Sequence, residues 1–179
     1  MSRLVFDIET NGLLDQLTTI HCIAIKDIAQ SDRRVQSMKT YGPHEVEEGL
    51  DALANAEEII GHNVIGFDIP AIQKLYPDWK PKGKVTDTLV LSRLIKADLM
   101  TEDSMRVKQP EGFLKRLYGS HSLKAWGMRL GNHKGDYDGG WETFSEDMLL
   151  YMIQDVYVTC DLLKLLNQDS DFSERSIRL

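Results

Sequence analysis

The stretch that decides the fold is Leu4-Val5-Phe6-Asp7-Ile8-Glu9-Thr10, an apolar strand pattern that carries two acidic side chains. Side chains two apart on a strand point to the same face, so Asp7 and Glu9 are predicted to lie side by side. Asn11-Gly12 follows as a turn signal that ends the strand. Adjacent carboxylates repel each other in apolar surroundings unless a cation lies between them. A strand end that dips into solvent is the alternative explanation of this pair.

A second acidic stretch, Asn63-Val64-Ile65-Gly66-Phe67-Asp68, follows an apolar segment over residues 57–61 that we predict to be a strand. Pro70 comes two residues after Asp68 and is followed by Ala71-Ile72-Gln73-Lys74-Leu75. This order is typical of an Asp N-cap and a helix, because proline is tolerated in a first helical turn. The Asp68 carboxylate can cap the helix only, or can also point at a metal site, and the spacing leaves both open.

The third stretch, Tyr151-Met152-Ile153-Gln154-Asp155, lies in the longest helical pattern, over residues 143–166. Thr143 and Glu146 fit a capping box at its start. Tyr151 and Asp155 are four residues apart, so they share one helix face. The alternative is an amphipathic helix with an ordinary exposed Asp. The apolar positions that define the pattern are Leu149, Met152, Ile153, Val156, Cys160 and Leu163.

Four carboxylates drawn from a strand and two helices suit a pair of hard divalent cations. Two such ions, about 4 Å apart, can activate a water and stabilise the negative charge that builds up during phosphodiester cleavage. Mg²⁺ and Mn²⁺ prefer oxygen ligands, whereas the histidines and cysteines here lack the spacing of a zinc site. The pKa of a free phenol is about 10. Tyr151 is therefore predicted to orient the attacking water through a hydrogen bond rather than to act as a base. The predicted metal ligands are Asp7, Glu9, Asp68 and Asp155.

Composition is that of one globular domain. The 179 residues are 42% hydrophobic and 27% charged, and no apolar run reaches the ~20 residues of a membrane span. Cys22 and Cys160 form no motif and are predicted to be reduced core thiols. The net charge of −7 predicts weak binding of nucleic acid, through a metal-bound terminal phosphate and stacked unpaired bases rather than a basic surface.

The order of elements predicts an α/β fold, a mixed β-sheet flanked by helices. Strands are expected over residues 3–8, 19–27, 34–41, 57–61 and 84–87, and helices over 44–55, 68–76, 88–96, 121–130 and 143–166. Residues 97–119 are the least regular part. Their basic residues, such as Arg106, Lys115 and Arg116, either guide a single strand or belong to an ordinary solvated loop, and Gly131–Gly140 has the same ambiguity.

The three acidic stretches resemble the motifs of the DEDD exonucleases. Tyr151, four before Asp155, resembles the DEDDy branch, whereas the DEDDh branch would have a histidine at Leu150. Outside these motifs, residues 87–94 and 119–131 resemble the exonuclease domain of the single-subunit family A DNA polymerases of short-tailed phages. The resemblance covers residues 4–166 and implies a ribonuclease H-like fold and a proofreading 3′–5′ exonuclease.

This resemblance also implies roles for individual residues. Asp7, Glu9 and Asp155 would hold one metal ion, Asp68 would reach a second, and Tyr151 would orient the water. The backbone at Thr10 would contact the terminal sugar and Leu13 would wedge against the last bases. Asn63 would bind near the terminal nucleotide, and Phe67 is a further candidate substrate contact.

The resemblance further implies the domain context. Residues 1–166 would form the exonuclease domain, and residues 167–179, with a polar linker over 167–171, would lead to a polymerase domain that acts in cis or in trans. The expected substrate is a single-stranded DNA 3′ end, the expected location is the cytoplasm of a phage-infected bacterium without membrane attachment, and the isolated chain would be a monomer. Trimming of RNA 3′ ends and a non-catalytic structural module are the alternatives.

Overall fold

The sheet positions the acidic residues, and five strands form it in the order β3-β2-β1-β4-β5. The computed structural model describes residues 2–29, 38–106, 108, 110, 113–132 and 137–177, with side chains as far as Asp169. β1 is antiparallel to β2, and β2 is antiparallel to β3. β1 is parallel to β4, and β4 is parallel to β5, so the sheet is mixed as predicted. The strands are β1 (Arg3–Thr10), β2 (Ile20–Asp27), β3 (Met38–Tyr41), β4 (Glu58–Gly61) and β5 (Lys84–Asp87).

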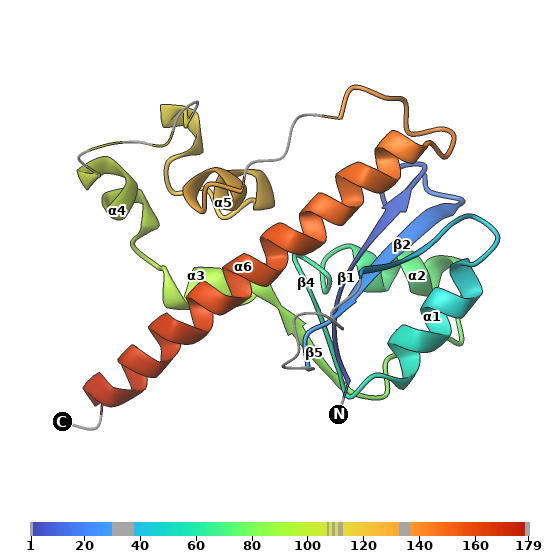
Figure 1. Ribbon diagram of the computed structural model, residues 1–179, viewed down its shortest axis with the longest axis horizontal. Coiled ribbons are helices and arrows are strands. Elements are labelled where there is room, and N and C mark those ends of the chain that lie inside the picture. Colours follow the sequence, from blue (N-terminus) through green and yellow to red (C-terminus); the bar gives the residue numbers. More distant parts are fainter. Residues whose placement is uncertain are drawn as a thin grey trace.

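Helices cover both faces of the sheet (Figure 1). Alternate residues of β1 divide between the two sides: Leu4, Phe6 and Ile8 join a core with the helices α1 and α2. Val5 packs with the apolar face of α6 on the other side. Asp7 and Glu9 therefore share the α6 side with Val5. The helices are α1 (Val46–Asn55), α2 (Asp68–Leu75), α3 (Thr88–Ile95), α4 (Leu99–Met105), α5 (Leu123–Arg129) and α6 (Glu146–Ile177), with a 3₁₀ turn, η1, at Lys115–Leu117.

The stretch 97–119, predicted to be the least regular, contains α4 and η1. A buried ion pair explains this order. Arg129 is sandwiched between the rings of Phe113 and Trp126 and donates from Nε and Nη2 to the Asp103 carboxylate at 3.0 and 2.7 Å. Its guanidinium also donates to the carbonyls of Leu117 and Ser120. These contacts tie α4, η1 and α5 together, and the apolar sequence pattern does not reveal them.

The long helix α6 departs from the prediction at both ends. It begins at Glu146, and the hydroxyl of Ser145 accepts a hydrogen bond from the Met148 amide at 3.1 Å, so the capping box predicted at Thr143 is wrong. It continues through Ile177, so the polar linker predicted over 167–171 is helical instead. The stretch 167–177 lacks proline and glycine, and nothing in it breaks the helix. Its final turns project beyond the sheet (Figure 1).

The remaining predicted elements are confirmed to within a few residues. Residues 34–37 of the predicted third strand lie outside the described part of the chain. Trp126 of α5 lies in the core and is 2% exposed. Among the helices of the described residues, none has both the length and the apolar character needed to cross a membrane.

Candidate metal centre and the adjoining pocket

β1 presents Asp7 and Glu9 next to the smallest side chains of β2. In the antiparallel register, Asp7 lies opposite Ala24 and Glu9 lies opposite Cys22. The pairing shifts between Glu9 and Thr10, at the end of β1. Small neighbours leave the space above the two carboxylates to the helix that crosses this face, which is α6.

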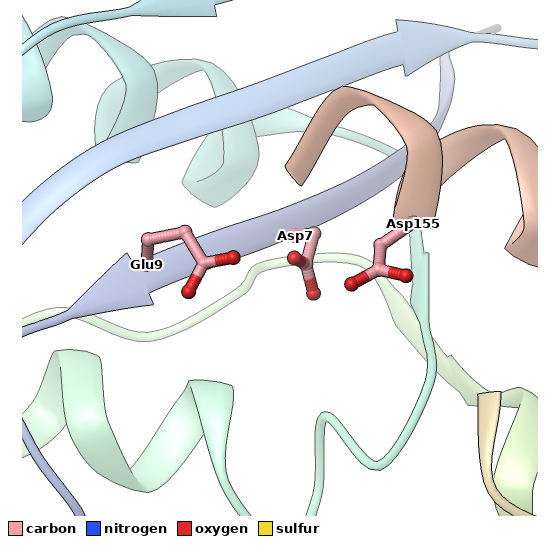
Figure 2. Close-up of side chains that lie close together, drawn as sticks. All are labelled: Asp7, Glu9 and Asp155. Carbon is pink, nitrogen blue, oxygen red and sulfur yellow. The ribbon is translucent and has the colours of Figure 1, made fainter. Parts of the chain in front are cut away.

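α6 delivers the third carboxylate. Its apolar residues Met148, Met152 and Val156 are fully buried against the sheet, and this packing turns Asp155 toward β1. One carboxylate oxygen from each of Asp7, Glu9 and Asp155 lies within 4.8 Å of the other two. Figure 2 shows Asp7 and Glu9 leaving the same side of β1, with Asp155 reaching toward them from α6. Three of the four predicted metal ligands are therefore brought together.

The surroundings of this cluster favour a hard cation. Glu9 and Asp155 are 8% and 7% exposed, so water screens their mutual repulsion poorly. Cys22 lies opposite Glu9 on β2, and burial, together with the charges of Glu9 and Asp7, raises the pKa of its thiol to about 12. A thiol that stays protonated is a poor metal ligand. The donors are thus carboxylate oxygens, which suit Mg²⁺ or Mn²⁺ better than zinc.

Asp68, the fourth predicted ligand, is not part of this cluster of three. It is 3% exposed at the first turn of α2. Burial raises its pKa to about 7, with backbone hydrogen bonds at Asp68 and Ile8 opposing the shift and the charges of Asp87 and Asp155 adding to it. The helix N-cap is Phe67, without a side-chain cap, so the prediction that Asp68 caps this helix is wrong. Asp68 is therefore a buried carboxyl group whose pKa is affected by the charge of Asp155, one of the three clustered carboxylates.

The loop that leads to Asp68 is held by Asp87, which our reading of the sequence did not single out for a role. Asp87 accepts hydrogen bonds from the amides of Asn63 and Ile65 at 2.9 and 3.0 Å, and from Leu89 at the start of α3 at 2.9 Å. Asn63 has a φ of 66°, a left-handed conformation that Asn tolerates better than most residues. Asp87 before a helical pattern is a recognisable N-cap signal, but its bonds to the 63–65 loop exist only in the folded chain.

A pocket of about 270 Å³ opens directly beside Glu9. Three of the four predicted substrate residues, Thr10, Leu13 and Phe67, line it. Asn63 lines a different cavity, of about 550 Å³, with His62, Arg93 and His121. Trp141 completes the first pocket, although sequence analysis did not single it out. A lone tryptophan in a Gly-rich stretch was the available signal.

Tyr151 lies one helical turn before Asp155 and belongs to an aromatic cluster. Its ring centroid is 5.6 Å from that of Tyr137 and 6.2 Å from that of Trp141. His21 of β2 is hydrogen-bonded through Nε2 to the Trp141 carbonyl oxygen at 2.9 Å. The segment before α6 is thereby fastened to β2 and packed against Tyr151.

The two stretches predicted either to guide a strand or to be solvated loops remain undecided. Arg106, Lys115 and Arg116 are exposed. Residues 107, 109, 111–112 and 133–136, which include Gly112 and Lys134 of these stretches, lie outside the described residues.

Two phage DNA polymerases are similar to this chain in sequence. The chain is 36% identical over 196 residues to the DNA-directed DNA polymerases of Escherichia phage T7 and Enterobacteria phage T3, in alignments that cover 94% of this chain and 27% of each polymerase. The chain thus spans about a quarter of these relatives.

Solved structures share the fold. Brucella melitensis NrnC bound to pGG aligns with a TM-score of 0.62 and 15% identity, over 98% of this chain and 76% of NrnC. Escherichia coli Exonuclease I in complex with a dT13 oligonucleotide aligns with a TM-score of 0.57 and 13% identity, over 98% and 43% of the two chains. A family model described as the RNase_H superfamily matches residues 4–167. The chain therefore belongs to the RNase_H superfamily.

Proposed function

We propose that this chain is a metal-dependent 3′–5′ exonuclease that removes nucleotides from DNA 3′ ends and serves as the proofreading domain of a DNA polymerase. One observation carries the proposal: three carboxylates from β1 and α6 converge beside an apolar pocket. Such a pocket accepts one unpaired base while the carboxylates face the phosphate of the same nucleotide. The 36% identity to two phage DNA polymerases supports DNA as the substrate and a polymerase as the partner. Residues 1–166 would form the nuclease unit and residues 167–179 would lead to the polymerase.

The carboxylates would divide the metal ions between them. Asp7, Glu9 and Asp155 would hold one Mg²⁺ or Mn²⁺, since their oxygens lie within 4.8 Å of one another. Asp68 would reach a second ion through water, because it is buried apart from the other three. When bound, the two ions would supply an acidified water and neutralise the charge that develops on the phosphate.

The protein groups would then position the reaction. Tyr151 would donate a hydrogen bond to the attacking water, or accept one from it, and so hold the oxygen of the water in line with the phosphorus. The aromatic packing around Tyr151 limits the freedom of its ring. The water oxygen forms a bond to phosphorus, and the bond to the 3′ oxygen of the preceding nucleotide breaks. The attacking water gives up a proton to solvent, the 3′ oxygen takes one up from solvent, and a nucleoside 5′-monophosphate leaves.

Affinity for the substrate would be modest. The net charge of −7 disfavours a long electrostatic interface with a duplex. Leu13, which is 70% exposed, offers an apolar contact to the terminal base instead. The polymerase would have to supply most of the binding contacts to the duplex, and it would deliver frayed 3′ ends to the pocket.

The test is a time course with a 5′-labelled single-stranded DNA oligonucleotide, in Mg²⁺ or Mn²⁺ and in EDTA. We expect a metal-dependent ladder that shortens from the 3′ end, because a 5′–3′ enzyme would release the label at once as a mononucleotide. The Asp7→Ala/Glu9→Ala protein should produce no ladder. Asp51→Asn, which changes an exposed carboxylate on α1, is the matched control and should cut at the wild-type rate.

Two further arms separate the alternatives. A matched RNA strand that is shortened faster than DNA would identify an exoribonuclease. Absence of cleavage of both the DNA and the RNA strand would favour a non-catalytic module. Tyr151→Phe should lower the rate by about 10²-fold with folding unchanged, because the attacking water loses the hydroxyl that positions it. A wild-type rate in Tyr151→Phe contradicts the role of this tyrosine in aiming the water.

A further inference from the structure

We infer that Trp141 stacks on the base of the 3′-terminal nucleotide, and that the segment 137–145 forms one wall of the substrate site. This inference rests on the proposed exonuclease function and goes beyond it, because it assigns a base-binding role to a residue outside the acidic motifs. The ligand class is a flat purine or pyrimidine base freed from its duplex partner.

The location of Trp141 points to this role. Trp141 lines the 270 Å³ pocket together with Glu9, so the pocket adjoins a carboxylate that would face the scissile phosphate under the proposed function. Within one nucleotide the base lies next to its own 5′ phosphate, so a phosphate at Glu9 brings the attached base into this pocket. The hydroxyl of Thr10 already donates to the Gly12 carbonyl at 2.9 Å, which leaves mainly apolar walls for the base.

Trp141 is held in place before any substrate arrives. The backbone of Trp141 is bonded to His21 of β2, through its carbonyl oxygen at 2.9 Å. The ring of Tyr137 packs edge-on against the indole at 4.8 Å. The Tyr137 hydroxyl bonds to the Gly140 carbonyl at 3.1 Å and to the hydroxyl of Ser145, the cap of α6, at 3.0 Å. A preorganised ring loses little conformational entropy when a base stacks on it.

The exposure of Trp141 has no structural explanation in the fold itself. Its side chain is 39% exposed, whereas Trp126 is 2% exposed in the core and Trp79 donates from Nε1 to the Leu50 carbonyl at 2.9 Å. An exposed indole beside an apolar pocket is typical of a ligand-binding surface. Aromatic side chains bind single-stranded nucleic acid because every base has a flat face to stack, whatever its sequence.

The test compares two oligonucleotides, one with an ordinary 3′-terminal nucleotide and one whose 3′-terminal nucleotide lacks the base. Wild-type protein should prefer the ordinary end in kcat/KM by about 5- to 150-fold, the range that stacking of one base supports. Trp141→Leu, which keeps an apolar side chain without the aromatic face, should bring that preference close to onefold. Trp141→Phe should restore most of it, and Trp79→Phe is the matched control that should leave it unchanged.

A structural role for Trp141 gives a different result. If Trp141→Leu slows both substrates equally, or leaves the preference unchanged, the inference is overturned while the exonuclease proposal stands. A second measurement covers the case in which no strand is cut by any protein. In Mg²⁺, the ordinary strand should quench the tryptophan fluorescence of the Trp79→Phe protein and the strand without the terminal base should not. Equal quenching by both strands overturns the inference there.

Discussion

Replacing Asp7 by asparagine should change the stability of the protein in opposite directions with and without metal. Asn has the shape of Asp without its charge, so the substitution removes one of the three crowded negative charges and leaves the packing in place. In EDTA the variant should be more stable than the wild type, because the repulsion is relieved. In saturating Mg²⁺ or Mn²⁺ the wild type should be the more stable protein, because it alone has the complete set of ligands.

The magnitude follows from the geometry. Two unit charges 4.8 Å apart interact by about 3.5 kcal/mol at an effective dielectric constant of about 20. Asp7 takes part in two such pairs, but it is half-buried, and solvent and proton uptake relieve much of the repulsion. We therefore expect a net gain of about 2 kcal/mol for Asp7→Asn in EDTA, or about 4–8 °C in Tm for a chain of this size. Metal at about 100 times its dissociation constant should stabilise the wild type by about 2.7 kcal/mol.

The assay is thermal unfolding followed by circular dichroism, with each protein in EDTA and in millimolar Mg²⁺ or Mn²⁺. Asp51→Asn controls for the removal of one negative charge at an exposed site, and its Tm should follow that of the wild type in both conditions. A wild-type Tm that is the same with and without metal, together with an Asp7→Asn protein no more stable in EDTA, would refute the assignment of these carboxylates to a cation.

Three other predictions concern buried groups other than the three clustered carboxylates. Arg129→Met should lower the free energy of unfolding by about 3–5 kcal/mol in a urea titration, since it removes the guanidinium that pairs with the buried Asp103 carboxylate. Lys84→Met, which removes an exposed cation, is the control and should change the free energy of unfolding by less than about 1 kcal/mol. Burial lowers the pKa of His62 to about 4, so between pH 6.5 and 4 the unfolded chain binds a proton that the folded chain excludes. The stability that this group contributes above pH 6.5 should therefore be lost as the pH falls from 6.5 to 4. In His62→Asn, this part of the pH dependence of the urea midpoint should disappear. The Cys22 thiol, with its pKa raised to about 12, should resist iodoacetamide at pH 8 in the folded protein and react at once in urea, and modification without unfolding would contradict its burial.

Local patterns in the sequence determined most of the elements and two of the three carboxylates of the acidic cluster. The strand alternation of residues 4–10 is enough to place Asp7 and Glu9 on one face, because the direction of a side chain on a strand depends only on its parity. The 3.6-residue period of α6 likewise selects the face that carries Met152 and Val156 against the sheet. These are short-range properties, and each can be read without knowledge of the partner element.

Only the tertiary structure decided which groups meet. Asp155 joins Asp7 and Glu9 because α6 crosses the sheet at that point, whereas Asp68, from α2, stays outside their cluster. Asp87 fixes the loop before Asp68, and Trp141 reaches the pocket through a bond from its backbone to His21, 120 residues away in the chain. The helix α4 owes its order to the Arg129–Asp103 pair. Contacts between distant residues depend on how whole elements pack, and a pattern within one element carries no information about the side chain that will face it across the fold.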